Sequence, residues 1–238
     1  MERVELNRRI DFDLYLVTDR HQTGGRSLDE VVEEALAGGV RAVQLREKDL
    51  SEREILRWAE KLRSLTSRFG ARLLINDRLD VCLAVGADGV HLRADSLPVS
   101  AARKLLGPER LIGQSTHGVS EVIEAHRAGA DFVVLGPIYD TPAKRLMGRP
   151  LGPSVIRSAA AQVSIPVFAI GGIRLEQISE VIRNGGQGVA VISALLQAPN
   201  PREAAAMMLR ALEPLRSTTT ISSFDDVRER AIDRSWVR

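Results

Sequence analysis

Short apolar runs alternate with amphipathic segments along most of the chain. Each run is only a few residues long and is continuously apolar rather than alternating. This pattern indicates strands that are buried on both faces, as in a parallel sheet. The predicted strands cover Leu14–Thr18, Ala42–Leu45, Leu73–Ile75, Gly89–Leu92, Leu111–Gln114, Phe132–Leu135, Pro166–Ile170 and Gly188–Ile192.

An amphipathic, helix-like segment follows each run. The first begins at Ser27, and Glu30 three residues later predicts a capping box there. The second begins at Ser51 and extends to about Phe69. The other predicted helices cover Leu79–Val85, Pro98–Leu106, Ser120–Ala128, Pro153–Ala161, Leu175–Asn184 and Pro201–Leu215.

Eight strands that are each followed by a helix, with mostly short connections, predict an α/β fold of the (β/α)₈ TIM barrel type. A doubly wound open sheet is the alternative, although it usually has fewer strands. We predict a single catalytic barrel domain over residues 1–216. Residues 217–238 are polar and charged, and we expect a tail that is either an extra helix or partly disordered.

Composition and charge narrow the class of protein. Of the 238 residues, 44% are hydrophobic and only 4% aromatic, so the core must be built mainly from aliphatic side chains. The net charge is +2 with both signs mixed, which argues against a nucleic-acid-binding protein. The only cysteine, Cys82, excludes an internal disulfide and a cysteine-rich zinc site.

The hydropathy of the chain also predicts where in the cell the protein is located. The first residues lack the apolar core of a signal peptide, and no run approaches the ~18 apolar residues of a membrane span. We therefore expect a soluble, cytoplasmic protein that binds small molecules and neither nucleic acid nor a membrane. The sequence is compatible with a homo-oligomer but does not determine the oligomeric state.

The active site of such a barrel lies at the C-terminal ends of its strands. Gly171 and Gly172 follow the seventh strand and Ser193 follows the eighth, where barrels commonly bind phosphate through backbone N–H groups. The glycine pair alone would also be compatible with a simple turn.

A second anion site is indicated on other strand ends. Arg46, Lys48, Asn76 and Lys144 would surround a more highly charged anion such as pyrophosphate. Asp77 and Asp95 would then hold Mg²⁺, which prefers oxygen ligands and substrate phosphates.

Structural roles are the alternative for several of these residues. Arg46 and Lys48 could be solvated surface charges. Asp77 could cap a helix beginning at Arg78, and Asp95 or Ser96 could cap one beginning at Pro98. His91 could be a barrel-lining histidine, and His117 could serve a structural hydrogen bond.

The long connection from Gly136 to Gly152 stands apart from the short ones. It contains Thr141, which can donate a hydrogen bond, and the cations Lys144 and Arg145. Connections of this length in compact domains are usually functional or disordered. We interpret it as a loop that closes over a negatively charged substrate.

Several motifs at these positions resemble the thiamine-phosphate synthase superfamily. They are YLVTDR, VQLREKD, LLINDRLDVCLAVGADGVHL, IGQSTH, GADFVVLGPIYDTPAK, IPVFAIGGI and GVAVISALL, and they span about residues 12–215 in order. The resemblance implies the same barrel and one of two activities. One branch is the synthase, and the other is a thiazole tautomerase that needs no metal.

For the synthase branch, the resemblance implies that a hydroxymethylpyrimidine pyrophosphate is joined to a thiazole phosphate with Mg²⁺, releasing pyrophosphate. Gln44 and Ser115 would lie at the pyrimidine and the leaving group. Pyrophosphate would be bound by Arg46, Lys48, Asn76 and Lys144, with Asp77 on the metal. The thiazole phosphate would be held by Thr141, Gly172, Ile192 and Ser193. We take Arg46, Ser115, His117 and Lys144 as the catalytic candidates.

The chain departs from the synthase pattern at two places. Ser96 stands where the synthases have a metal-binding Asp, with Asp95 as the neighbouring carboxylate, and Ala143 replaces a threonine in the loop. We predict a thiamine-phosphate synthase. The alternatives are a tautomerase that uses His117 as acid or base, and a non-catalytic binder of thiazole or thiamine phosphate.

Overall fold

Eight parallel strands close into a barrel, as predicted. The computed structural model describes residues 10–141 and 149–213. The strands pair in chain order, and β1 pairs with β8 to close the ring. They are β1 (Leu14–Val17), β2 (Ala42–Leu45), β3 (Arg72–Asn76), β4 (Gly89–Leu92), β5 (Leu111–Thr116), β6 (Phe132–Leu135), β7 (Val167–Ile170) and β8 (Gly188–Val191).

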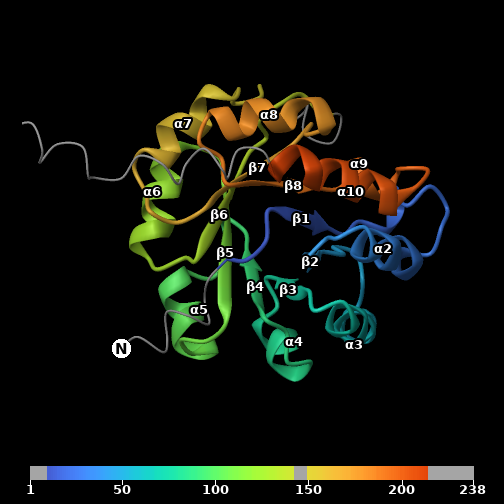
Figure 1. The fold of residues 1–238 in the computed structure, drawn as a ribbon. Coiled ribbons are helices and arrows are strands. Elements are labelled where there is room, and N and C mark those ends of the chain that lie inside the picture. Colours follow the sequence, from blue (N-terminus) through green and yellow to red (C-terminus); the bar gives the residue numbers. More distant parts are fainter. Residues whose placement is uncertain (1–9, 142–148, 214–238) are drawn as a thin grey trace, which may run out of the picture.

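The helices lie outside this ring, as Figure 1 shows. A 3₁₀ turn, η1, covers Arg20–Gln22 after β1, and β8 is followed by the short α9 (Ser193–Leu196) before α10 (Pro201–Leu212). The remaining helices are α2 (Leu28–Ala37), α3 (Glu52–Arg68), α4 (Leu79–Ala84), α5 (Val99–Leu106), α6 (Val119–Arg127), α7 (Ser154–Ala160) and α8 (Leu175–Arg183).

The core has two layers because each strand is buried on both faces. The outer layer packs strands against helices with aliphatic side chains. The inner layer fills the barrel with aromatic side chains, and the rings of Phe12 and Phe132 meet edge to face at 5.7 Å. Phe12 lies two residues before β1 and packs at the N-terminal end of the barrel, whereas the cavity opens at the C-terminal end.

The predicted capping box at Ser27 is wrong. The Ser27 hydroxyl is bonded to Asp29, and it makes no cap hydrogen bond to the backbone of α2. The capping box is present at the start of α3 instead, where Ser51 and Glu54 each bond the other's backbone N–H. The same Ser-x-x-Glu motif therefore caps α3 but not α2.

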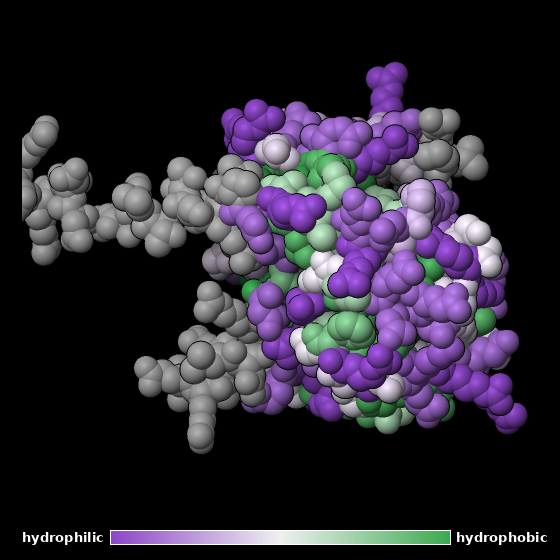
Figure 2. All heavy atoms as spheres, turned by 45° about the vertical axis from the view of Figure 1, so that its right-hand side comes forward, coloured by the Kyte–Doolittle hydropathy of each residue, from purple (hydrophilic) through white to green (hydrophobic). Residues whose placement is uncertain are grey.

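The described surface is mainly polar. Figure 2 shows one face on which hydrophilic side chains predominate and hydrophobic ones appear in small patches between them. Among the described helices, none combines the length and apolar character needed to span a bilayer. The predicted tail at 217–238 lies outside the described residues, as does Lys144.

Candidate active site

A cavity of about 940 Å³ opens at the C-terminal ends of the strands. Its wall combines polar and apolar side chains from most of the strands and from the loops that follow them. It brings together eight of the residues predicted from the sequence, namely Gln44, Arg46, Ser115, His117, Thr141, Gly172, Ile192 and Ser193. Thr141 is the last described residue before the gap at 142–148.

The loops after β6 and β7 are packed directly on each other at one side of this cavity. The backbone N–H of Tyr139 donates to the carbonyl of Gly171 at 3.0 Å. A Cβ on Gly172 would lie 2.6 Å from the carbonyl oxygen of Asp140, and Gly172 also has a φ of +67°. Only glycine meets both conditions, so the close packing of these two loops requires glycine at this position.

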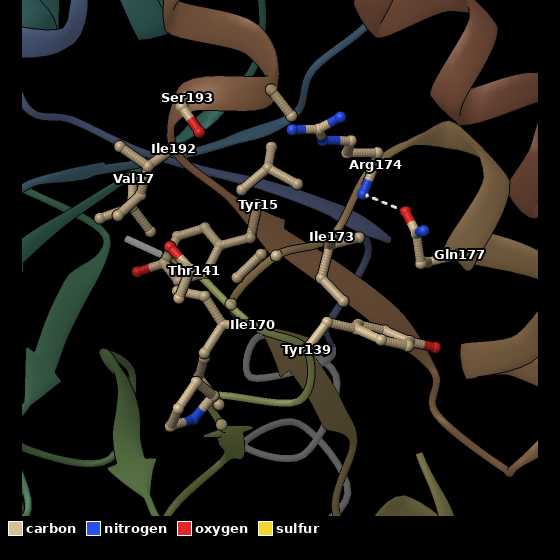
Figure 3. A pocket seen from close by; sticks show the side chains of 18 of the residues that line it. Tyr15, Val17, Tyr139, Thr141, Ile170, Ile173, Arg174, Gln177, Ile192 and Ser193 are labelled. Carbon is tan, nitrogen blue, oxygen red and sulfur yellow. Dashed lines mark hydrogen bonds between the residues drawn. The ribbon is translucent and has the colours of Figure 1, made fainter. Parts of the chain in front are cut away.

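Arg174 was not predicted from the sequence, although it directly follows Gly172 and Ile173. It lines the cavity at the start of α8, where its backbone N–H donates to Oε1 of Gln177 at 3.0 Å. Figure 3 shows its guanidinium and the Ser193 hydroxyl directed towards each other on the same side of the pocket. A cation and a hydroxyl beside a glycine turn together suit a phosphate group.

Two buried polar pairs support the floor of the cavity. The Gln44 amide donates to the Tyr15 hydroxyl at 3.2 Å, and Nε2 of His91 lies 3.0 Å from the Ser115 hydroxyl. Burial, and then the charge of Arg46, lower the pKa of His91 to about 3. His91 is therefore neutral at physiological pH and lines the barrel, which confirms its structural reading.

His117 lies at the cavity wall and is held by α6. Its backbone N–H and its Nδ1 both contact Oε2 of Glu121, at 2.9 and 3.2 Å. This confirms the structural hydrogen bond, and it leaves only Nε2 for a contact with a substrate.

Only some of the residues of the predicted pyrophosphate site line the cavity. Arg46 lines it and is anchored by its backbone N–H, which donates to the Thr18 hydroxyl at 2.9 Å. Lys48 is exposed, and the Asn76 amide donates to Oδ2 of Asp77 at 3.2 Å. Neither Lys48 nor Asn76 belongs to the cavity lining that the described residues form.

Asp77 and Asp95, the predicted magnesium ligands, both contact Arg93. Oδ2 of Asp77 lies 2.6 Å from Nε of Arg93, and Oδ1 of Asp95 lies 3.4 Å from the same atom. Asp77 does not cap α4, whose N-cap residue is Arg78 and has no side-chain cap bond. Nor does Asp95 or Ser96 cap α5, because Pro98 takes that position without such a bond.

This arrangement does not fit a bound metal as it stands. Both oxygens of Asp77 already accept N–H donors, and a guanidinium lies where a cation would sit. In the described part of the chain, no three His, Cys, Asp or Glu side chains are grouped so that they could hold a metal ion. A metal at Asp77 would therefore require Arg93 to move.

The sequence and the fold are similar to those of known proteins. A family model described as thiamine monophosphate synthase matches residues 14–195. A putative thiamine-phosphate synthase of Geobacter sulfurreducens is 54% identical over 206 residues, which cover 87% of this chain and 97% of that protein. The thiamine-phosphate synthase of Clostridium novyi is 44% identical over 79% of this chain and 92% of its own length.

A solved structure is similar over nearly the same extent. It is the thiamine phosphate pyrophosphorylase of Pyrococcus furiosus, with a TM-score of 0.78 and 36% identity, and the match covers 88% of this chain and 98% of that chain.

Proposed function

The chain belongs to the thiamine monophosphate synthase family, and from that premise we propose that it makes thiamine phosphate. It is a transferase that joins 4-amino-2-methyl-5-hydroxymethylpyrimidine pyrophosphate to 4-methyl-5-(2-phosphoethyl)thiazole and releases pyrophosphate. The observation that supports this proposal is one cavity lined by Gly172 and Ser193 on one side and by the guanidinium-bearing Arg46 on another part of its wall.

The proposed phosphate end lies at β7 and β8. The Gly172 backbone, the Ser193 hydroxyl and the Arg174 guanidinium would bind the thiazole phosphate, while Thr141 and Ile192 would contact the thiazole. Because β4 and β8 are four places apart in a ring of eight strands, the end of β4 lies across the barrel from this wall. The two substrates would therefore lie with their anionic groups apart and their reacting atoms between them.

The proposed leaving-group end lies at β2 to β5. Arg46, Lys48 and Asn76, with Lys144 from the loop, would stabilise the departing pyrophosphate, and Gln44 and Ser115 would orient the pyrimidine. The methylene–oxygen bond breaks, the methylene gains positive charge, and the thiazole nitrogen forms the new bond to it. Such chemistry depends on electrostatic stabilisation and positioning more than on an acid or base, so we assign His117 a contact role.

Magnesium is a separate part of the proposal. We expect the family's reaction to use Mg²⁺ as the cation on pyrophosphate, which is the kind of charge that the ion commonly binds. Asp77 and Asp95, the ligands expected from the sequence, are both paired to Arg93, so we do not assign the ion to this pair.

The test is a product assay with both substrates, with Mg²⁺ and with EDTA. We expect thiamine phosphate and pyrophosphate to form in equal amounts in the presence of Mg²⁺. If the chain formed neither but aromatised the thiazole phosphate carboxylate in EDTA, it would be a tautomerase. If it bound thiazole phosphate but converted neither the synthase substrates nor the thiazole phosphate carboxylate, it would be a non-catalytic binding protein.

A further inference from the structure

The guanidinium of Arg93 occupies the space between the two carboxylates that the sequence assigns to a metal. Arg93 follows β4 directly, one residue after Leu92. Its Nε is 2.6 Å from Asp77 and 3.4 Å from Asp95. The chain therefore supplies a positive charge of its own at this place.

The backbone conformation of Asp77 places its carboxylate against Arg93. It has a φ of +58° and, among the described residues, is the only one other than glycine with positive φ. In this conformation its backbone N–H donates to the His91 carbonyl at 3.0 Å, and its Oδ1 accepts the backbone N–H of Arg93 at 2.9 Å. Residues other than glycine rarely adopt such a φ, so Asp77 is fixed to the end of β4 by several bonds at once.

The outer part of the Arg93 side chain is available to a ligand. The ion pairs use Nε, and the side chain is 52% exposed. Within residues 10–141 and 149–213, no hydrogen bond reaches either terminal nitrogen of Arg93. A guanidinium that is held at Nε presents two parallel N–H donors, a geometry that matches phosphate oxygens.

Arg93 lies close enough to Arg46 for their charges to interact. Burial lowers the pKa of Arg46, the carboxylates of Asp19, Glu47 and Asp77 raise it, and the charge of Arg93 lowers it further. An anion between these two cations would stabilise both of them.

We propose that Arg93 binds the pyrophosphate group directly and that Asp77 is a positioning residue for Arg93. This rests on the proposed function, which supplies the pyrophosphate. The site would then bind pyrophosphate without a metal bridging Asp77 to it, and the ligand would approach the terminal nitrogens of Arg93 while Nε stays on Asp77.

The test is calorimetric titration of inorganic pyrophosphate into the full chain in EDTA. We expect the wild type to bind and Arg93→Gln to bind about tenfold more weakly or worse, because charge-assisted bonds are lost. Arg93→Lys should keep part of the affinity. Asp77→Asn should also weaken binding in EDTA, because the Arg93 side chain loses its anchor.

The control is Arg78→Gln, which removes another arginine paired to an aspartate, Asp80, at 2.6 Å. It should bind pyrophosphate like the wild type, and thermal unfolding of every variant verifies its folding. The inference is overturned if binding requires Mg²⁺ in the wild type, or if folded Arg93→Gln binds like the wild type in EDTA. Assaying thiamine phosphate formation on the same samples separates this result from a failure of the proposed function.

Discussion

At the scale of single residues, Arg174 is a cation that lines the cavity on the same side as Ser193. We expect Arg174→Gln to raise the KM for the thiazole phosphate about tenfold with kcat little changed, because the lost contact is to a group remote from the bond that forms. Steady-state kinetics with the pyrimidine substrate saturating would measure this.

Arg183→Gln is the matched control, because Arg183 lies on the same helix, is exposed and does not line the cavity. A fall in kcat at unchanged KM in Arg174→Gln would instead place Arg174 in the chemical step.

His91 gives a prediction about stability and pH. In the folded chain burial, and then the charge of Arg46, lower its pKa to about 3, whereas the ordinary value is 6.5. Between these values the unfolded chain binds the additional proton, so the free energy of unfolding should fall as the pH drops below about 6.5. Urea unfolding at pH 7.5 and pH 5 should show a larger loss in the wild type than in His91→Gln. Equal losses would contradict the buried neutral imidazole.

The sequence allowed us to predict residues that lie at the end of their own strand. It did not allow us to predict contacts between residues that are far apart in the chain. Gln44, Ser115 and Ser193 follow from their positions after apolar runs. By contrast, nothing near Asp77 in the sequence shows that Arg93, sixteen residues later, takes both of its oxygens. Arg174 could have been found, since it stands just beyond the predicted phosphate turn.

At the scale of elements, the two Ser-x-x-Glu motifs behave differently at α2 and α3. We expect Ser51→Ala to lower the free energy of unfolding by about 1 kcal/mol, because it removes a cap of α3. Ser27→Ala should cost clearly less, because Ser27 caps no backbone N–H. Urea unfolding of both variants provides the measurement, and equal losses would show that the Ser51 cap contributes nothing specific.

The strands were the most predictable elements. All eight lie where the apolar runs predicted them, with no end shifted by more than two residues. Continuous burial on both faces leaves a strong signal in the sequence. The helix starts were predicted to within one residue, whereas the hydrogen bonding of the Ser27 cap was not.

At the scale of the whole molecule, the eight strands close the described barrel without any contribution from residues 217–238. Strands β1 and β8 pair directly, and the described residues that line the cavity all fall between Tyr15 and Met208. We therefore expect a chain that ends at Arg216 to keep the kcat and both KM values of the full chain. Steady-state kinetics of the two chains would test this, and a loss of activity in a folded short chain would assign residues 217–238 to the site.

The ion pair between Asp77 and Arg93 also bears on product release. A metal ion can diffuse away together with pyrophosphate, whereas a guanidinium stays on the chain and must let its ligand go. Asp77 offers Arg93 a partner at 2.6 Å whenever the ligand is absent. If the proposal holds, Nε stays on Asp77 when the product leaves, so the guanidinium keeps its position for the next pyrophosphate between turnovers.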